Sequence, residues 1–252
     1  MGILEQLHNS LIFFPTKDFF SSPLDEDVEH EDVYIKTEDD ETLHGYFLPV
    51  KNQTKVMLYL HGNADNVSTW YTACTEIQKH VHVNALIVDY RGYGKSTGKP
   101  TVKGVINDVL AMYKYLIARG FKGEDISVYG RSLGGALALE LTAREQVRST
   151  VVQSSFTSLK DIAKALYPFV PEKIVINGHL NSVEHIKKIS VPILISHGDR
   201  DEIIPVAHSY KLYATARNQD KKKLIILKGA MHNNLSNFFD EEYFKSLNHM
   251  FL

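Results

Sequence analysis

The sequence predicts an α/β protein with a mostly parallel central sheet, and three observations lead to this prediction. The chain has 252 residues, of which 44% are hydrophobic, so it can fill one large core. Short apolar runs alternate with amphipathic stretches of helical length. Several of those runs end in polar or glycine-rich segments, and the carboxyl ends of parallel strands are where such sheets carry their sites. We expect one domain over residues 1–252.

Composition excludes several classes of function. The formal net charge of -2 gives no overall basic field, so nucleic acid is not expected as a partner. A single cysteine, Cys74, excludes an intramolecular disulfide framework and fits a reducing compartment. The N-terminal apolar patch is too short for a signal peptide or a spanning helix. We therefore expect a cytoplasmic protein.

The first fifth of the chain leads into the alternating pattern. Residues 4–20 are expected to form a short helix and a turn that cover one flank of the sheet, and a contact with a membrane surface is the alternative. Residues 33–37 and 43–50 resemble two antiparallel strands around the polar turn at 38–41. The sequence thus predicts a hairpin before the first buried strand.

Strands and helices then alternate, with one interruption. We expect strands at 56–60, 85–89, 126–129, 150–153, 192–196 and 223–227, and helices at 66–80, 102–119, 205–216 and 241–252, with a further helix after Ser132. About forty residues after the fourth of these strands do not fit the alternation. Residues 159–169 resemble a helix there, and 175–189 a second short one. This insertion, at about 156–190, is expected to form a lid over the site.

The stretch ISVYGRSLGGALALE, residues 126–140, reads as a strand, an abrupt turn and a helix with Ser132 at the bend. It contains the pattern G-x-S-x-G, in which glycines remove side chains that would clash where strand meets helix. The amide of Leu133 would then lie at a helix N-terminus, suited to receive an oxyanion. The pattern alone is weak, because a chain of this length shows it by chance roughly one time in ten to twenty.

A serine nucleophile needs a histidine base and an acid that orients it. His232 follows the strand at 223–227 and is the best placed of twelve histidines. Asp201 follows the strand at 192–196, and the order serine, acid, histidine is the one that this turn requires. Asp199, two residues earlier, is a rival for the acid.

The segment His61-Gly62-Asn63 ends the strand at 56–60 and offers the amide of Asn63 as a second oxyanion donor. His61 is expected to brace that loop, and Asp89 and Arg91 to pair or to cap the same region. No spacing of His, Cys, Asp and Glu indicates a metal, and no phosphate-binding loop is present. We expect no cofactor.

Four motifs, HGNADN, DYRGYGKS, GRSLGG and HGDRDEIIP, together resemble the α/β-hydrolase superfamily, in particular its small, depalmitoylase-like serine hydrolases. The resemblance extends from about Phe13 to the C-terminus. It implies the α/β-hydrolase fold, Ser132 as nucleophile, Asp201 as acid and His232 as base, and it implies esterase, thioesterase or lipase-like activity. Depalmitoylating relatives carry an N-terminal cysteine cluster that this chain lacks, which favours a small ester or thioester as the substrate.

The expected reaction is hydrolysis of a carboxylic ester or thioester through an acyl-enzyme. Phe156, Tyr167 and Met231 are expected to line the acyl pocket, and Leu166 and Phe169 are further candidates. Two alternatives remain open: a peptidase of the same fold, and a non-catalytic binding member of it. The partner is expected to be the small acyl substrate, with a weak membrane contact through the N-terminal segment as a further option.

Overall fold

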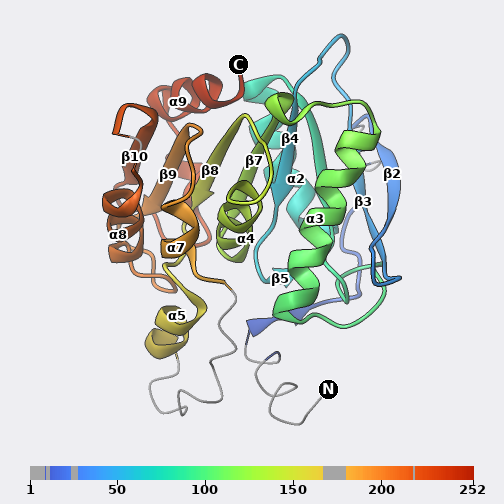
Figure 1. Ribbon diagram of the computed structural model, residues 1–252, viewed down its shortest axis with the longest axis horizontal. Helices are drawn as coiled ribbons and strands as arrows, with labels where there is room; N and C mark the ends of the chain where they lie inside the picture. The colour runs from blue at the N-terminus through green and yellow to red at the C-terminus, as the bar shows by residue number, and fades with distance from the viewer. Residues whose placement is uncertain (1–8, 10–11, 24–27, 167–179, 218) are drawn as a thin grey trace.

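The computed structural model describes residues 9, 12–23, 28–166, 180–217 and 219–252 (Figure 1). Its centre is an eight-stranded sheet of order β10-β9-β8-β7-β4-β6-β3-β2, in which β4 and β6 to β10 are parallel and β2 and β3 antiparallel. The strands are β2 (Glu31–Lys36), β3 (Thr42–Leu48), β4 (Val56–Leu60), β6 (Asn84–Val88), β7 (Ile126–Arg131), β8 (Ser149–Gln153), β9 (Ile193–Gly198) and β10 (Lys222–Leu227). The predicted fold class is confirmed.

The position of each strand in the sheet follows from its residues. All five residues of β4 and all five of β6 are buried, because helices cover both faces of the central strands. The edge strand β2 instead alternates, with Val33 and Ile35 buried and Tyr34 and Lys36 exposed. The continuous apolar runs therefore mark the centre of the sheet, and alternation marks its edge.

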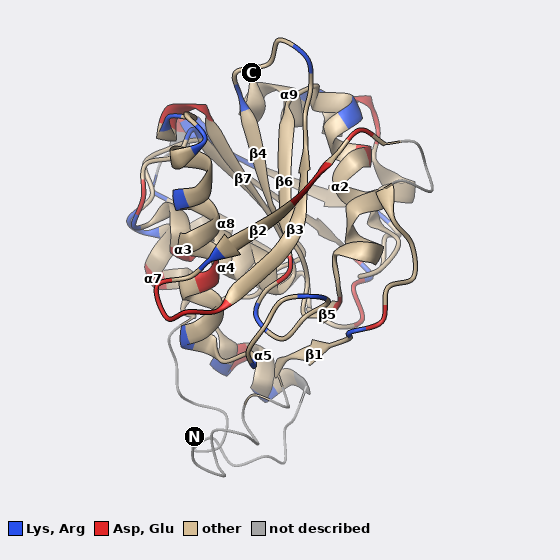
Figure 2. Cartoon of the chain, turned by 90° about the vertical axis from the view of Figure 1, so that its right-hand side faces the viewer, with Lys and Arg blue, Asp and Glu red and all other residues tan. Residues whose placement is uncertain are grey.

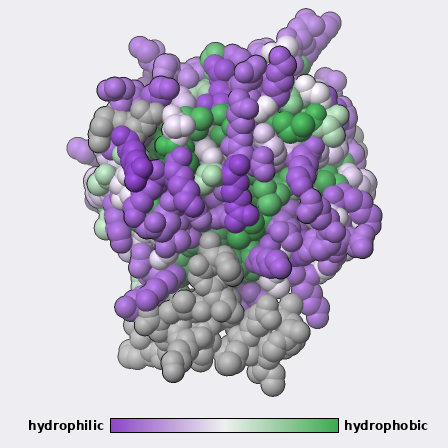
Figure 3. All heavy atoms as spheres, in the orientation of Figure 1, coloured by the Kyte–Doolittle hydropathy of each residue, from purple (hydrophilic) through white to green (hydrophobic). Residues whose placement is uncertain are grey.

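Helices form a layer on each face, which Figure 2 shows with the sheet seen nearly edge-on. The buried residues of α3 and α4 belong to the core on one face, and those of α2 and α9 belong to the core on the other. Figure 3 shows that the outer surface over α3 and α4 is mainly hydrophilic. The helices are α2 (Val67–Val81), α3 (Val102–Ala118), α4 (Leu133–Thr142), α5 (Leu159–Leu166), α7 (Ser182–Ile186), α8 (Ala207–Thr215) and α9 (Glu241–Phe251), with 3-10 turns η2 (Gly123–Asp125), η3 (Gln219–Lys221) and η4 (Leu235–Phe238).

The N-terminal segment is helical at Asn9 and Ile12, as expected, but differs from the expected helix and turn after Phe13. Phe14–Pro15 forms a short strand, β1, parallel to β5 at Ala64–Asp65. The backbone N–H of Phe14 donates to the carbonyl oxygen of Asn63 (3.0 Å), which ties this segment to the loop after β4. The expectation of a helix is wrong at these residues, and residues 1–8 and 10–11 lie outside the described chain.

The expected insertion lies between β8 and β9, with α5 at its start and α7 near its end. In Figure 1, α5 lies below the sheet at the same end as β5 and β1, which is the end that the parallel strands point to. Within the described ranges, no helix is both long and apolar enough to span a membrane. The insertion thus places a helix beside the strand ends where the candidate residues converge.

Candidate active site

Ser132 lies at a strained turn between β7 and α4. Its backbone has a φ of 55° and a ψ of -118°, outside the regions that non-glycine residues usually adopt. A Cβ at Gly134 would lie 2.0 Å from the carbonyl oxygen of Leu60, so only glycine permits this approach to β4. The Ser132 N–H donates to the carbonyl of Gln153 on β8 (2.8 Å), which holds the strained residue in place.

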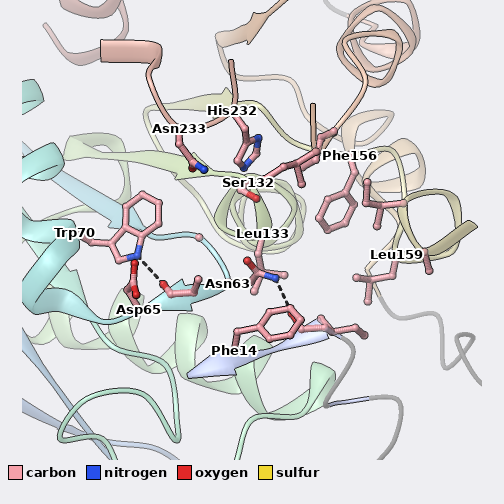
Figure 4. A pocket seen from close by; sticks show the side chains of 17 residues that line it. Phe14, Asn63, Asp65, Trp70, Ser132, Leu133, Phe156, Leu159, His232 and Asn233 are labelled. Carbon is pink, nitrogen blue, oxygen red and sulfur yellow. Dashed lines mark hydrogen bonds between the residues drawn. The ribbon is translucent and has the colours of Figure 1, made fainter. Parts of the chain in front are cut away.

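His232 and Asp201 come from two neighbouring loops, after β10 and β9. Nδ1 of His232 lies 2.7 Å from Oδ2 of Asp201, and the other carboxylate oxygen accepts the backbone N–H groups of Ile203 (3.0 Å) and Ile204 (2.7 Å). With Nδ1 donating to the carboxylate, Nε2 is left as the proton acceptor. Figure 4 shows the His232 ring directly above the Ser132 hydroxyl.

Asp201 is held as a carboxylate by its donors. Burial alone would raise the pKa of Asp201, but hydrogen bonds from His197 and His232 lower it well below its usual value. His197 is wholly buried, with Nε2 2.8 Å from the carbonyl oxygen of Ile204 and 3.2 Å from Oδ2 of Asp201. His197 was not predicted as a site residue, although it stands in the HGD segment that drew attention to the two acids.

The rival acid, Asp199, is oriented away from this arrangement. Its Oδ1 accepts the backbone N–H of Gly229 (2.6 Å), and so it braces the turn after β10. Of the two carboxylates, only Asp201 contacts His232.

The loop after β4 carries Asn63, whose groups are held from three sides. The Asn63 carbonyl accepts the hydroxyl of Tyr93 (2.7 Å) as well as the N–H of Phe14, and its side-chain amide donates to the carbonyl of Ile12 (2.8 Å). Leu133 begins α4, where backbone N–H groups have no acceptor within the helix. Asn63 and Leu133 both line the same cavity as Ser132.

His61 and Asp89 form a buried pair beneath that loop. Burial lowers the pKa of His61 to about 4, so the imidazole is uncharged at neutral pH, and burial raises the pKa of Asp89 well above its usual value. Nδ1 of His61 donates to the carbonyl of Gly62 (2.7 Å), and Oδ1 of Asp89 accepts the N–H of Val67 at the start of α2 (2.8 Å). This geometry agrees with a bracing role for His61.

Of the expected roles of Asp89 and Arg91, to pair or to cap this region, the pairing is wrong, whereas Asp89 does accept the N–H at the start of α2. Arg91 instead forms ion pairs with Asp108 of α3 and with Asp39, both at 2.7 Å. No short-range pattern in the sequence indicates that Arg91 pairs with either of these residues.

A cavity of about 330 Å³ lies between α5 and the loops that follow β4, β9 and β10. Phe156 lines it as expected, whereas Met231 is 43% exposed and is not among the lining residues, because its side chain turns outward. Tyr167 and Phe169 lie outside the described residues, as does the side chain of Leu166. The lining residues are Ile12, Phe14, Gly62, Asn63, Ala64, Asp65, Trp70, Ser132, Leu133, Phe156, Leu159, Ile162, Ala163, Ile203, Ile204, His232 and Asn233.

Comparison with known proteins places the chain in a family. The family model described as alpha/beta hydrolase fold matches residues 55–186. The chain belongs to the α/β-hydrolase family. This α/β hydrolase also matches the model described as serine aminopeptidase, S33, over residues 173–237.

Two relatives in sequence illustrate the breadth of the family. Protein bem46 of Schizosaccharomyces pombe is 30% identical over 236 residues, which cover 88% of this chain and 79% of the relative. The alpha/beta hydrolase domain-containing protein WAV2 of Arabidopsis thaliana is 27% identical over 239 residues, which cover 86% of this chain and 78% of the relative.

Solved structures agree in fold. An esterase from Pyrococcus furiosus superposes with a TM-score of 0.77 at 24% identity, covering 95% of this chain and 97% of that one. Est1E from Butyrivibrio proteoclasticus, solved with ferulic acid bound, gives a TM-score of 0.69 at 22% identity, covering 87% of this chain and 96% of that one. At these identities the likeness is one of fold.

Proposed function

We propose that this α/β hydrolase is a serine hydrolase that cleaves carboxylic esters or thioesters through an acyl-enzyme. The observation that carries the proposal is the 2.7 Å contact between His232 Nδ1 and Asp201, with Ser132 on a strained turn facing the same cavity. An ionised acid, a histidine with a free Nε2 and a presented hydroxyl are the parts that acyl transfer requires.

In the proposed mechanism, His232 Nε2 takes the proton of Ser132 as Oγ attacks the acyl carbon. The amides of Asn63 and Leu133 donate to the oxyanion that forms, and ionised Asp201 stabilises the imidazolium. His232 then protonates the leaving alcohol or thiol as its bond to the acyl carbon breaks. Water attacks the acyl-enzyme with His232 again as the base, and the acid leaves as Ser132 regains its proton.

The lining of the cavity suggests an uncharged, apolar acyl group. Phe14 on one side and Leu159 of α5 on the other present apolar side chains to the space beside Ser132 (Figure 4). Ile162 and Ala163 of α5 also line this cavity. Lengthening an acyl chain into this space would bury further methylene groups, each contributing up to about 0.8 kcal/mol. Turnover of p-nitrophenyl esters should therefore rise with chain length until the cavity is full.

A peptidase is the second candidate, favoured by the match of residues 173–237 to the serine aminopeptidase model. The same three side chains would then act on an amide. Aminoacyl p-nitroanilides separate the two functions, because an esterase site leaves them largely intact while a peptidase hydrolyses them at rates comparable to esters.

The proposal is tested by labelling the purified protein with a fluorophosphonate and locating the modified residue by mass spectrometry. We expect modification at Ser132. The variant Ser132→Ala should lower ester turnover by ~10⁴-fold or more with the fold intact. The exposed Ser236 offers a matched control, since Ser236→Ala should leave turnover unchanged. Unchanged turnover in Ser132→Ala would refute the assignment, whereas absence of both labelling and turnover in the wild type would favour a binding function.

A further inference from the structure

Arg131, the residue before Ser132, reaches the loop that carries His232. Its Nη2 donates to the backbone carbonyl oxygen of His232 (2.8 Å). We propose that Arg131 is a positioning residue: it fixes the backbone of His232 relative to Ser132, so that Nε2 stays within reach of the hydroxyl. The inference rests on the proposed function.

The opposite side of His232 is held as well. Its backbone N–H donates to Oε2 of Glu202 (3.1 Å), a residue adjacent to Asp201. A guanidinium thus holds the C=O and a carboxylate the N–H, and hydrogen bonds with a charged partner are stronger than neutral ones. With Asp201 on Nδ1, three contacts determine where the ring of His232 lies.

Arg131 also contacts Trp70 of α2, which packs against the loop that carries Asn63. Its guanidinium carbon lies 5.0 Å from the centre of the Trp70 ring, a cation–π distance. Trp70 in turn donates from Nε1 to the carbonyl of Ala64 (2.8 Å), and a Cβ at Gly62 would meet the Trp70 ring at 2.9 Å. Trp70 therefore links Arg131 to the loop of Gly62 and Ala64.

These contacts connect the three parts of the proposed site. Arg131 is bonded to Ser132 through the chain, to His232 through a hydrogen bond and to the loop of Asn63 through Trp70. Arg131 is absent from the residues that line the cavity, so it acts on the reaction through its neighbours and not on the substrate. A small displacement of a catalytic group can cost on the order of 10²-fold in rate, which makes such a link consequential.

Only arginine fits both contacts at once. Its planar guanidinium stacks on an aromatic ring while donating in its own plane, whereas lysine carries a compact point charge with no flat face. Arg131→Met should remove both contacts while keeping a long apolar stem, and Arg131→Lys should retain the charge but not the stacked geometry.

The test measures kcat and KM with p-nitrophenyl butyrate in the full-length protein. For Arg131→Met we expect kcat to fall about 10- to 100-fold with KM changed by less than about threefold, because positioning and not binding is lost. Arg131→Lys should fall between this variant and the wild type. Millimolar guanidinium chloride should restore part of kcat in Arg131→Met and none in the wild type.

Arg217→Met is the matched control, since Arg217 is exposed and follows α8, away from the cavity. It should keep wild-type kcat and show no effect of guanidinium. Glu202→Ala should lower kcat less than Arg131→Met, and Glu202→Gln, which keeps an acceptor, less again. If Arg131→Met does not fold, a wild-type kcat in Arg131→Lys overturns the inference.

The outcomes separate this inference from the proposed function. Absence of fluorophosphonate labelling at Ser132 in the wild type would refute the function itself. Labelling at Ser132 in the wild type, together with a wild-type kcat in folded Arg131→Met, would leave the function standing and overturn the role of Arg131. A fall in kcat that guanidinium does not relieve and that is accompanied by an equal rise in KM would also overturn it.

Discussion

Two histidine–aspartate pairs lie at the same edge of the sheet, and they differ in almost every electrostatic respect. His232 and Asp201 are 2.7 Å apart beside the cavity, whereas His61 and Asp89 are 3.6 Å apart beneath the loop after β4. The carboxylates of both pairs are fully buried. Asp89 nevertheless lies deeper, and burial is the main cause of its raised pKa, whereas at Asp201 hydrogen bonds outweigh burial and lower the pKa.

The hydrogen-bond donors of the two acids also differ. Asp201 accepts from two backbone N–H groups and lies within 3.2 Å of a nitrogen of His197 and of His232. Asp89 accepts one backbone N–H, from Val67, and its Oδ2 has no partner among the described residues. Donors stabilise the charged form of a buried acid, and with fewer donors desolvation favours the neutral form. The comparison assigns charge to one pair and mechanical support to the other.

Replacing the aspartate by asparagine in each pair should give the largest difference in kcat between the two pairs. Asp201→Asn should lower kcat by about 10³- to 10⁴-fold, because an amide no longer fixes the tautomer of His232 or stabilises its positive charge. Asp89→Asn introduces a neutral amide where burial favours the neutral acid, and the amide oxygen can still accept from Val67, so kcat should stay within about threefold. Steady-state kinetics with p-nitrophenyl butyrate measures both. Equal losses would contradict the assignment of charge.

The lowered pKa of His61 also predicts a dependence of stability on pH. The pKa of His61 is about 4 in the folded protein against a reference of 6.5. As the pH falls, His61 therefore binds a proton first in the unfolded chain, and its contribution to the free energy of unfolding should decrease between pH 6.5 and 4. The raised pKa of Asp89 acts in the opposite direction, so the effect of His61 is measured as a difference from a variant. The decrease in the contribution of His61 is at most about 3 kcal/mol.

Urea unfolding at pH 7 and pH 4.5 measures the effect against His61→Asn, which keeps a donor near the position of Nδ1 and cannot titrate. The variant should lose less stability on acidification than the wild type. The exposed His249 provides a control, since His249→Asn should behave as the wild type does. Identical pH dependence in His61→Asn would mean that protonated His61 is stabilised by an ionised Asp89.

The strand-end rule explains how much of the site could be predicted from the sequence. Ser132, Asp201 and His232 follow three strands whose runs were identified, and parallel strands deliver their ends to one edge. The choice between Asp199 and Asp201 needed the loop itself: one turns to Gly229 and the other to His232.

Features made by contacts between distant segments could not be predicted. The two-residue strand at Phe14–Pro15 is too short to show a period, and it exists because β5 offers a partner. The ion pair of Arg91 with Asp108 joins a loop to a helix, and nothing in the spacing of the two residues indicates it. Met231 is adjacent to His232, yet the chain turns it outward while Ile203, from another loop, lines the cavity.

Asp65, a third carboxylate at this edge of the sheet, differs from Asp201 and Asp89 because it is exposed. Asp65 lies at the rim of the cavity beside Trp70 (Figure 4), and its side chain has no hydrogen bond or ion pair among the described residues. Solvent screens such a charge, so its effect on a substrate should be below about 1 kcal/mol.

Asp65 should nevertheless disfavour an acyl group that carries a negative charge. In the wild type, the mono-p-nitrophenyl ester of glutaric acid should have a lower kcat/KM than p-nitrophenyl hexanoate. In Asp65→Asn, the ratio of kcat/KM for the hexanoate to kcat/KM for the glutarate ester should be about two- to fivefold smaller. Sodium chloride at 0.5 M should narrow it in the wild type and have less effect in the variant, because salt screens an exposed charge. An unchanged ratio in Asp65→Asn would show that the apolar lining, and not this carboxylate, discriminates against charge.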